Sequence, residues 1–405
     1  MRIAMVSEHA SPLAALGGVD AGGQNVYVAR LSEELARRGH EVTVYTRRDS
    51  LDLPDRVPLP GGAAVEHVPA GPAEILPKDD LFPHMPAFGA HLARVWTAAR
   101  PDVVHAHFWM SGLAAQIGVQ PHGVPLVQTF HALGTVKRRH QGLRDTSPYA
   151  RVGIERQIGR TCARTLATCT DEVVELGEMG VPPRRISVVP CGVDATHFRP
   201  GADAGRAPAR GRRHRLLSCG RLVPRKGYED AVRALAGLPD AELLIAGGPP
   251  ADALAADPEA RRLTALAHRL GVADRVHLLG AVDPHHMPTL MGSADLVLCT
   301  PHYEPFGIVP LEAMACGVPV LATDVGGHRD SVSDGVTGRL VPPRDPGAVA
   351  AAARELLAAE ELRREYGAAG RARVLRHYTW RRVADGAEQV YRLTVADHEL
   401  AEEVA

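Results

Sequence analysis

The segment ADLVLCTPHYEPFGIVPLEAMACGVPVLAT, residues 294–323, reads as strand, loop, helix and strand. Residues 294–300 and 318–322 are short apolar runs of the β type. Between them we expect a helix from about Ile308 to Ala315, which Gly317 ends. Strands joined by a crossover helix form a parallel sheet, and such sheets bind ligands at the carboxyl ends of their strands. The segment therefore predicts an α/β fold with a ligand site in its loop.

Two glutamates bracket this loop. Glu304 precedes the helix and Glu312 lies about one turn inside it, so we expect their carboxylates ~10 Å apart at ~1.5 Å rise per residue. The N–H groups at the positive end of the helix dipole form an anion site between them. These are the N–H groups of Phe306, Gly307, Ile308 and Val309. A diphosphate bound there leaves one carboxylate for a hydroxylated ring on each side, which is the shape of a nucleotide-sugar.

The composition is that of an ordinary folded protein of two or three domains. Of 405 residues, 45% are hydrophobic and 23% charged, with a formal net charge of −1, so neither nucleic acid nor an anionic membrane is an expected partner. No apolar run of 18 residues predicts a transmembrane segment, and residues 1–7 read as a first strand rather than a signal peptide. Six scattered cysteines favour free thiols in a reducing cytoplasm and argue against structural zinc.

Alternating strands and helices predict two Rossmann-like, doubly wound domains. We expect the first at residues 1–198, the second at 199–378 after a Gly/Ala/Pro/Arg-rich linker at about 199–214, and a C-terminal helix at 379–405. The cleft between two such domains is the expected site. The first domain opens with a strand and a loop that carries Gly17-Gly18 and Gly22-Gly23. It contains no Gly-x-Gly-x-x-Gly dinucleotide fingerprint, but glycines before a helix let a ligand approach the backbone.

A basic turn at residues 220–227 follows the first strand of the second domain. Arg221 and Lys226 are placed to converge on one anion, and we expect Arg225 to point to solvent. Glu304 and Glu312 also have a spacing compatible with the acid and nucleophile of a glycoside hydrolase. The basic turn and the helix N–H groups argue against a hydrolase, because a neutral glycoside requires neither.

Residues 304–320 resemble the signature of the retaining glycosyltransferases of family four, which have the GT-B fold. The resemblance implies that Glu304 contacts the donor sugar hydroxyls and Glu312 the ribose, while Arg221 and Lys226 hold the diphosphate. Preorganised cations there stabilise the charge on the departing phosphate, which takes the proton of the acceptor. Residues 129–137 resemble the family segment in which a histidine, here His131, contacts the donor sugar.

The resemblance extends over the whole chain, and the GT-B fold implies that the C-terminal helix at 379–405 crosses back onto the first domain. Residues 20–30, 76–80, 105–112 and 130–134 resemble the group that contains the mycothiol-pathway inositol-phosphate N-acetylglucosaminyltransferase and the sucrose and sucrose-phosphate synthases. It implies that Lys78 and Arg151 bind a phosphate on the acceptor, although an exposed surface pair remains an alternative. This sequence departs from the pattern at Phe108, where a tyrosine is expected, and at Ala132, where a threonine is expected.

We therefore predict a cytoplasmic, retaining hexosyltransferase of glucose or N-acetylglucosamine type that needs no metal or other cofactor. Its substrates would be a nucleotide-diphosphate sugar and a small hydrophilic polyol or sugar, with or without a phosphate. The alternatives are a nucleotide-sugar epimerase of the same fold and a non-catalytic nucleotide-sugar-binding module; a monomer and a homodimer both remain open.

The predicted catalytic residues are Arg221, Lys226, Glu304 and His131. The predicted donor-binding residues are Gly23, Val282, Phe306, Gly307, Ile308, Val309 and Glu312. The predicted acceptor-binding residues are Gly22, Asn25, Lys78 and Arg151.

His105 and His107 alternate on one predicted strand, which suggests a metal site, but no third ligand is evident. We expect both histidines to pack in the core or behind the site.

Overall fold

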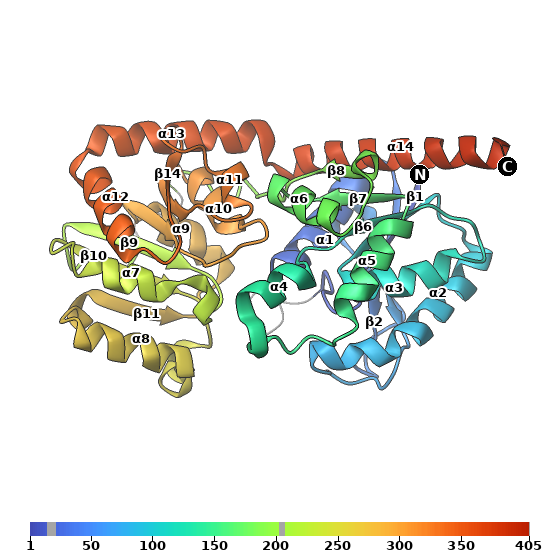
Figure 1. The fold of residues 1–405 in the computed structure, drawn as a ribbon, viewed down its shortest axis with the longest axis horizontal. Coiled ribbons are helices and arrows are strands. Elements are labelled where there is room, and N and C mark those ends of the chain that lie inside the picture. The colour runs from blue at the N-terminus through green and yellow to red at the C-terminus, as the bar shows by residue number, and fades with distance from the viewer. Residues whose placement is uncertain (14–21, 202–206, 405) are drawn as a thin grey trace. The chain divides into compact units, whose positions relative to one another are not determined.

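A computed structural model describes residues 1–13, 22–201 and 207–404 (Figure 1). Its internal contacts divide the chain into unit 1, Met1–Pro190 with Trp380–Ala405, and unit 2, Cys191–Thr379. The first boundary lies at 190/191 instead of the expected 198/199. Val193 explains the difference, because it forms a parallel bridge with Thr379 and its N–H donates to Tyr378 O at 2.8 Å. The predicted Gly17-Gly18 pair and part of the predicted linker lie outside the described residues.

Unit 1 is built on an eight-stranded sheet with the order β3-β4-β2-β1-β5-β6-β7-β8. Neighbouring strands are parallel except β3 and β4. The strands are β1 (Arg2–Val6), β2 (Glu41–Arg47), β3 (Arg56–Pro58), β4 (Ala64–Val68), β5 (Val103–His107), β6 (Leu126–Thr129), β7 (Arg164–Ala167) and β8 (Ile186–Val188). The chain runs from β1 outward to β2 on one side and returns to β5 on the other. The carboxyl ends of β1 and β5 thus form the topological switch point, where sheets of this type bind ligands.

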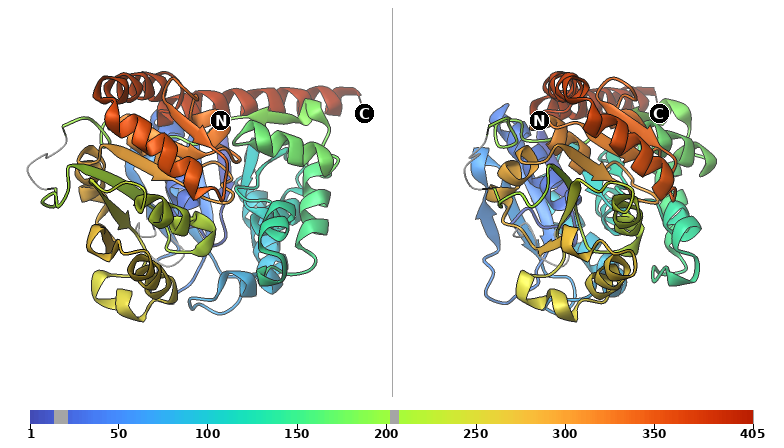
Figure 2. Two further views of the ribbon diagram at one scale, coloured as in Figure 1. Left: turned by 60° about the vertical axis from the view of Figure 1, so that its left-hand side comes forward. Right: turned by 90° about the vertical axis from the view of Figure 1, so that its left-hand side faces the viewer.

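Helices cover both faces of this sheet (Figures 1 and 2). They are α1 (Gly23–Arg37), α2 (Met85–Ala98), α3 (Trp109–Val119), α4 (Gly134–Gln141), α5 (Arg151–Thr161), α6 (Thr170–Glu178) and α14 (Trp380–Val404). The packing of α2 on α3 is close because α3 presents a glycine: a Cβ on Gly118 would lie 2.7 Å from the ring of Trp96. Phe88, Leu92 and Trp96 are buried on this side of the sheet, as the apolar spacing of α2 requires.

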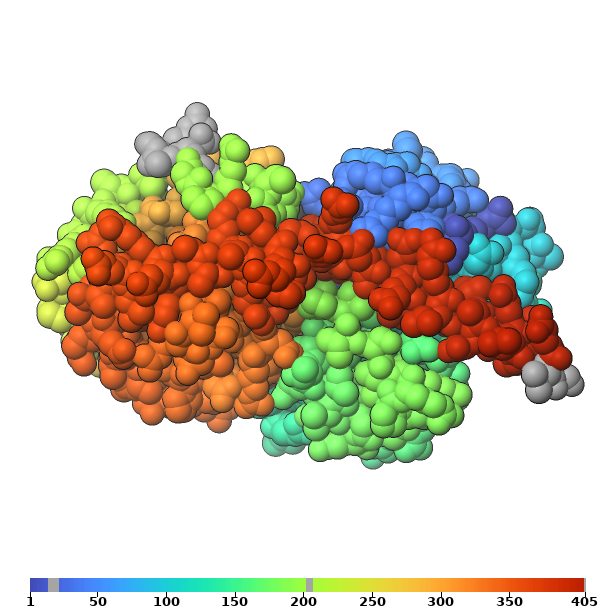
Figure 3. Space-filling model, turned by 90° about the horizontal axis from the view of Figure 1, so that it is seen from above, coloured from blue at the N-terminus to red at the C-terminus, as the bar shows by residue number. Residues whose placement is uncertain are grey.

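Helix α14 packs within unit 1 although it follows unit 2 in the chain. Arg38 Nη1, just after α1, lies 2.9 Å from Asp385 Oδ1 and 3.1 Å from Glu388 Oε2. The side chain of Tyr391 is completely buried, and its hydroxyl lies 2.6 Å from Nδ1 of His105. Figure 3 shows α14 in deep red on the surface of unit 1, beside the green part of the chain. No helix among the described residues has both the length and the apolar character that a membrane span requires.

Unit 2 contains a six-stranded parallel sheet with the order β11-β10-β9-β12-β13-β14. The strands are β9 (His214–Cys219), β10 (Ala241–Ala246), β11 (Val276–Gly280), β12 (Leu296–Cys299), β13 (Val320–Thr323) and β14 (Gly338–Val341). The helices of this unit are α7 (Tyr228–Leu235), α8 (Pro258–Arg269), α9 (Met287–Gly292), α10 (Ile308–Ala315), α11 (His328–Ser331), α12 (Pro346–Ala358) and α13 (Glu360–His377). The switch point lies between β9 and β12.

The predicted α/β class with two Rossmann-like sheets is confirmed. Helix α10 has the bounds expected from sequence, and it connects two parallel strands as predicted. Helix α13 was not expected from the sequence, because its side chains show no clear apolar stripe although Tyr366 and Val374 are buried.

Candidate functional site

The two motif stretches of unit 2 leave the sheet from neighbouring strands. The basic turn follows β9 and the loop that contains Glu304 follows β12, and these strands pair in parallel through Leu216 and Leu296. Both stretches therefore begin at the switch point of this sheet. Residues about 80 positions apart in sequence are brought together because parallel strands have their carboxyl ends at one edge.

The turn and the loop are joined by hydrogen bonds to the carbonyls of Arg225 and Gly227. Thr300 Oγ1 donates to the Gly227 carbonyl at 2.9 Å, and His302 N donates to Arg225 O at 2.8 Å. Gly227 has φ +67°, and a Cβ there would lie 1.8 Å from Thr300 O. Any other residue would push the turn away from the loop.

The Glu304 carboxylate forms ion pairs with two cations of the basic turn, Lys226 and Arg225. Lys226 Nζ lies 2.5 Å from Glu304 Oε2, and Arg225 Nη1 lies 3.8 Å from the same oxygen. The Arg225 guanidinium also lies over the Tyr303 ring, 5.4 Å from its centroid. The expectation that Arg225 points to solvent was wrong: its side chain is 20% exposed and Nη1 is buried, because residues 300–304 pack across the turn. Arg221 is exposed directly after β9.

The pKa values of Glu304 and Glu312 are shifted in opposite directions. Burial raises the pKa of Glu304, but Lys226 and Arg225 lower it by more, so the pKa is about 2 and this carboxyl is ionised at neutral pH. Burial raises the pKa of Glu312 to about 7, and Lys226 opposes this shift only partly. One site therefore contains a permanent carboxylate and a carboxyl that ionises near neutrality.

The backbone just before α10 packs against a glycine pair, Gly326-Gly327, which was not among the residues predicted for the site. Gly307, with φ +84°, is the N-cap of α10, and a Cβ on it would lie 2.9 Å from the His328 ring. A Cβ on Gly326 would lie 2.0 Å from Glu304 O, and one on Gly327 would lie 2.4 Å from Phe306 Cα. The signal was present in the sequence: a Gly-Gly pair three residues after an apolar strand marks a close backbone approach.

The other predicted donor-binding residues divide between two places. Phe306 is buried beside Gly307, and Ile308 and Val309 form the first turn of α10 with their side chains partly buried. Val282 follows β11, the edge strand of this sheet.

In unit 1 the switch point carries Phe108, directly after β5. Two predicted acceptor-binding cations lie on its ring: Lys78 Nζ is 5.2 Å and Arg151 Cζ is 5.0 Å from the ring centroid. Both distances are within the range of a cation–π contact. His9, three residues after the end of β1, lies edge-on to the same ring, with the two ring centroids 5.0 Å apart. The structure thus collects residues from three distant segments around Phe108.

Arg151 is buried and fully engaged. It is 2% exposed; its Nε donates to Glu155 Oε1 at 2.7 Å and its Nη2 to Ala132 O at 2.6 Å. Glu155 also accepts from the N–H of Gly134, which begins α4. The alternative of an exposed surface pair is therefore wrong for Arg151, while Lys78 is partly buried at the start of a short 3₁₀ helix.

His131 is partly buried and lies beside two buried histidines, His107 and His105. Its Nε2 lies 3.1 Å from Nδ1 of His107, and the two rings stack at 5.3 Å. His105 lies beside His107 and uses both ring nitrogens, with Tyr391 Oη at 2.6 Å and Thr129 Oγ1 at 2.9 Å. Burial lowers the pKa of His131 and of His105 to about 3, so both are neutral at physiological pH. His105 and His107 pack behind His131, as expected.

The start of α1 holds the remaining predicted residues. Gly22 is the N-cap, and its N–H donates to Asn25 Oδ1 at 3.0 Å, while Asn25 Nδ2 donates to Ser11 O at 3.1 Å. Asn25 is 4% exposed, so its side chain orders the entry to α1. A Cβ on Gly22 would meet nothing within 4 Å, and Gly23 is the first residue of the helix.

Comparison with known proteins decides the family. The model described as Glycosyltransferase Family 4 matches residues 21–197, and the one described as Glycosyl transferases group 1 matches residues 204–373. The D-inositol 3-phosphate glycosyltransferase of Geodermatophilus obscurus is 40% identical over 419 residues, which cover 99% of this chain and 90% of that protein. The chain belongs to glycosyltransferase family 4. The corresponding protein of Acidothermus cellulolyticus is 39% identical over 421 residues, covering 99% of this chain and 92% of the relative.

A solved structure supports the same family and fold. The sucrose-phosphate synthase of Thermosynechococcus elongatus superposes with a TM-score of 0.88 at 32% identity, covering 98% of this chain and 99% of that one. The chain is therefore a family 4 glycosyltransferase with the GT-B fold, and the recognition made from its motifs is confirmed.

Proposed function

We propose that this family 4 glycosyltransferase transfers a hexosyl group, with retention of configuration, from a nucleotide-diphosphate sugar to a small phosphorylated polyol or sugar. The observation that carries the donor half is the contact of Lys226 with Glu304 at the start of α10. A cation and helix N–H groups suit a diphosphate, and an ionised carboxylate beside them suits sugar hydroxyls.

The proposed reaction uses charge already placed in unit 2. The bond between the anomeric carbon and the diphosphate oxygen breaks, and the acceptor oxygen bonds to that carbon. The departing phosphate takes the acceptor's proton on the same face, so no protein base is assigned. Lys226 and Arg221, with the α10 N–H groups, stabilise the leaving charge, and Glu304 holds the sugar hydroxyls. Glu312 contacts the ribose, His131 the transferred sugar and Val282 the base.

The acceptor half rests on Lys78 and Arg151. Both cations lie on the Phe108 ring at the switch point of unit 1, where Glu155 compensates the charge of Arg151. The relatives support a phosphorylated acceptor, because the name of one includes inositol 3-phosphate and that of the other sucrose-phosphate. Phe108 and Ala132 supply no hydroxyl, and each hydrogen bond to a charged group is worth roughly 1.5–3 kcal/mol. We therefore expect weaker phosphate binding than in an enzyme that has both hydroxyls.

The proposal includes independence from added metal and a cytoplasmic location. Cationic side chains take the role that a divalent ion would have at the leaving group. The six cysteines are all free and buried, which suits a reducing compartment. Transfer assayed in EDTA and in Mg²⁺ should give the same rate within about twofold, and a strict requirement for metal would overturn this part.

The test is a matrix of UDP-, GDP-, ADP- and TDP-sugars against inositol phosphates, hexose phosphates and their unphosphorylated forms. We expect one donor class to give product only with a phosphorylated acceptor, and ¹H NMR of the anomeric proton should show the donor's configuration. An altered sugar nucleotide formed without acceptor would indicate an epimerase. Donor binding without turnover under any condition would indicate a binding module.

A further inference from the structure

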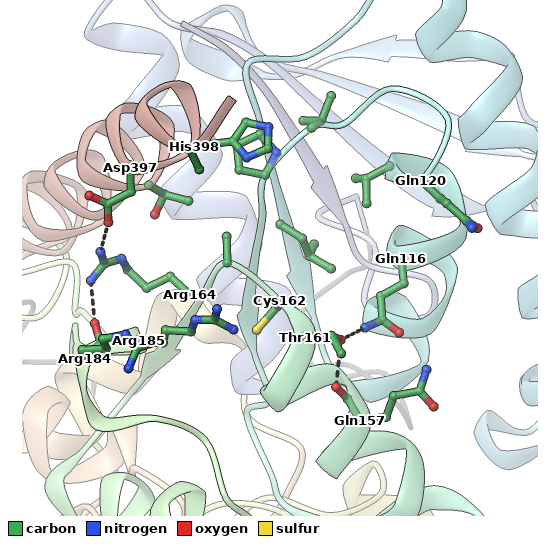
Figure 4. A pocket seen from close by; sticks show the side chains of 17 residues that line it. Gln116, Gln120, Gln157, Thr161, Cys162, Arg164, Arg184, Arg185, Asp397 and His398 are labelled. Atoms are coloured by element: carbon green, nitrogen blue, oxygen red, sulfur yellow. Dashed lines mark hydrogen bonds and ion pairs between the residues drawn. The ribbon is translucent and has the colours of Figure 1, made fainter. Parts of the chain in front are cut away.

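Unit 1 contains a cavity at the amino ends of its strands, whereas Phe108 follows the carboxyl end of β5. It has a volume of about 660 Å³ and is lined at the amino ends of β6 and β7, the carboxyl ends of α3 and α5, and one side of α14 (Figure 4). Leu126 and Arg164, the first residues of β6 and β7, lie in its wall. Because the strands are parallel, this edge is the far end from the carboxyl-end loops that carry Phe108 and His131. The cavity is thus separate from the proposed acceptor site.

One wall of the cavity is formed by arginines. Arg164 Nη2 donates to Asp397 Oδ2 at 2.7 Å and Nη1 to Arg184 O at 3.3 Å, while its buried Nε has no hydrogen-bond partner among the described residues. Arg185 Nη1 donates to Arg160 O at 3.1 Å. The exposed Arg184 guanidinium makes no hydrogen bond or ion pair within the part of the chain that the structure describes.

The facing wall is polar but uncharged. Gln116 Nε2 donates to Thr161 Oγ1 at 2.6 Å, and Gln157 and Gln120 also line the cavity. Figure 4 shows Gln116, Thr161 and Gln157 together on one side and the arginines with Asp397 on the other, with Cys162 between them. A ligand that spans the cavity would therefore meet guanidinium groups at one end and amide and hydroxyl groups at the other.

The charge balance favours an anion. Three arginines face one carboxylate, Asp397, which leaves two positive charges in excess. The carboxyl ends of α3 and α5 contribute about −0.5 charge each and reduce the excess to about one. Thr161 Oγ1 and Arg185 already donate to carbonyls at the end of α5, so those carbonyls are partly satisfied. A neutral ligand would leave the charge of Arg184 uncompensated, and the volume exceeds what one inorganic anion fills.

We propose that this cavity is a second ligand site, for a small polyhydroxylated phosphate monoester such as a sugar phosphate. The phosphate lies on the arginine wall, where guanidinium groups bind it bidentately, and the hydroxyls lie on the glutamine wall. Four residues of α14, among them Asp397 and His398, line the site, so the ligand also ties α14 to the body of unit 1.

The experiment is calorimetric titration of Lys78→Ala protein with glucose 6-phosphate, without nucleotide. This background weakens the acceptor site proposed on Phe108. We expect glucose 6-phosphate to bind at least tenfold more tightly than glucose or inorganic phosphate. Arg184→Gln and Gln157→Leu should each weaken it at least fivefold, whereas Arg156→Gln, an exposed change on α5 outside the cavity, should leave it unchanged.

Three results would overturn the proposal. They are no binding in the Lys78→Ala background, equal affinity in the Arg184→Gln and Arg156→Gln variants, and equal affinity for glucose 6-phosphate and inorganic phosphate. Transferase activity of Arg184→Gln should stay at wild-type level, so failure of the cavity and failure of the proposed function are distinguishable.

Discussion

The two switch points use the same position in the fold but arrange charge differently. In unit 2 the Lys226 ammonium is paired with the partly exposed Glu304, and in the proposed function an incoming diphosphate takes the cation and leaves the carboxylate for hydroxyl groups. In unit 1 the carboxylate partner of Arg151 is Glu155, which is completely buried and also holds the N–H of Gly134. The pair in unit 2 can exchange partners, whereas the pair in unit 1 is part of the core. This difference predicts that one cation mainly affects activity and the other mainly stability.

Arg151→Ala should show the largest effect, on stability. It would leave Glu155 buried without its cation, which typically costs about 3–5 kcal/mol. Urea unfolding should show this loss, while Arg156→Ala on the exposed side of the same helix should change stability by less than about 0.5 kcal/mol. Equal stability of the two variants would remove the distinction between the two units.

Lys226→Ala should affect activity most. Loss of a preorganised group at the leaving charge costs about 10²–10³ in kcat, or about 2.7–4 kcal/mol. Because Glu304 keeps Arg225 at 3.8 Å when Lys226 is removed, the unfolding midpoint should change less than in Arg151→Ala. Arg233→Ala on α7, an exposed cation paired with Glu229, is the matched control and should retain wild-type kcat. A kcat for Lys226→Ala within tenfold of wild type would contradict the proposed role.

Lys78→Ala should raise KM for a phosphorylated acceptor by about 10–100-fold, equivalent to about 1.5–3 kcal/mol for one charged hydrogen bond. Its kcat and its donor hydrolysis should remain near wild type, because Lys78 is not among the proposed donor contacts. This variant separates binding from folding where Arg151→Ala cannot. An unchanged acceptor KM would place the acceptor phosphate elsewhere.

Glu312→Gln should have the smallest effect, on the pH dependence of stability. The pKa of Glu312 is raised to about 7 from an ordinary value of 4.5, so its contribution to stability is complete below pH 4.5 and is lost as pH rises through 7. Discounted for partial exposure, the change is on the order of 1 kcal/mol. Thermal unfolding of wild type and Glu312→Gln between pH 5 and 8 should converge at the acid end and favour the variant at the alkaline end. A constant difference across this range would mean that Glu312 ionises normally.

The strand–loop–helix segment that carries Glu304 could be predicted because its signals are local. Helix α10 and its flanking strands have the predicted order, and Glu304 and Gly307 lie within four residues of each other. Arg225 was misplaced because its environment comes from Tyr303 and Glu304, more than 75 residues away, and no local pattern reports that contact.

The sequence by itself determined the α/β class, the family through its motifs, and the placement of Glu304 and the basic turn after the carboxyl ends of parallel strands. Strand patterns and helix termini are local, and a switch-point loop must follow a strand. The tertiary structure alone decided that Lys78 and Arg151 share the Phe108 ring and that Arg151 belongs to the core. It also decided that Tyr391 of α14 bonds to His105, 286 residues earlier. These contacts depend on how helices and loops pack across the sheet, which side-chain periodicity does not specify.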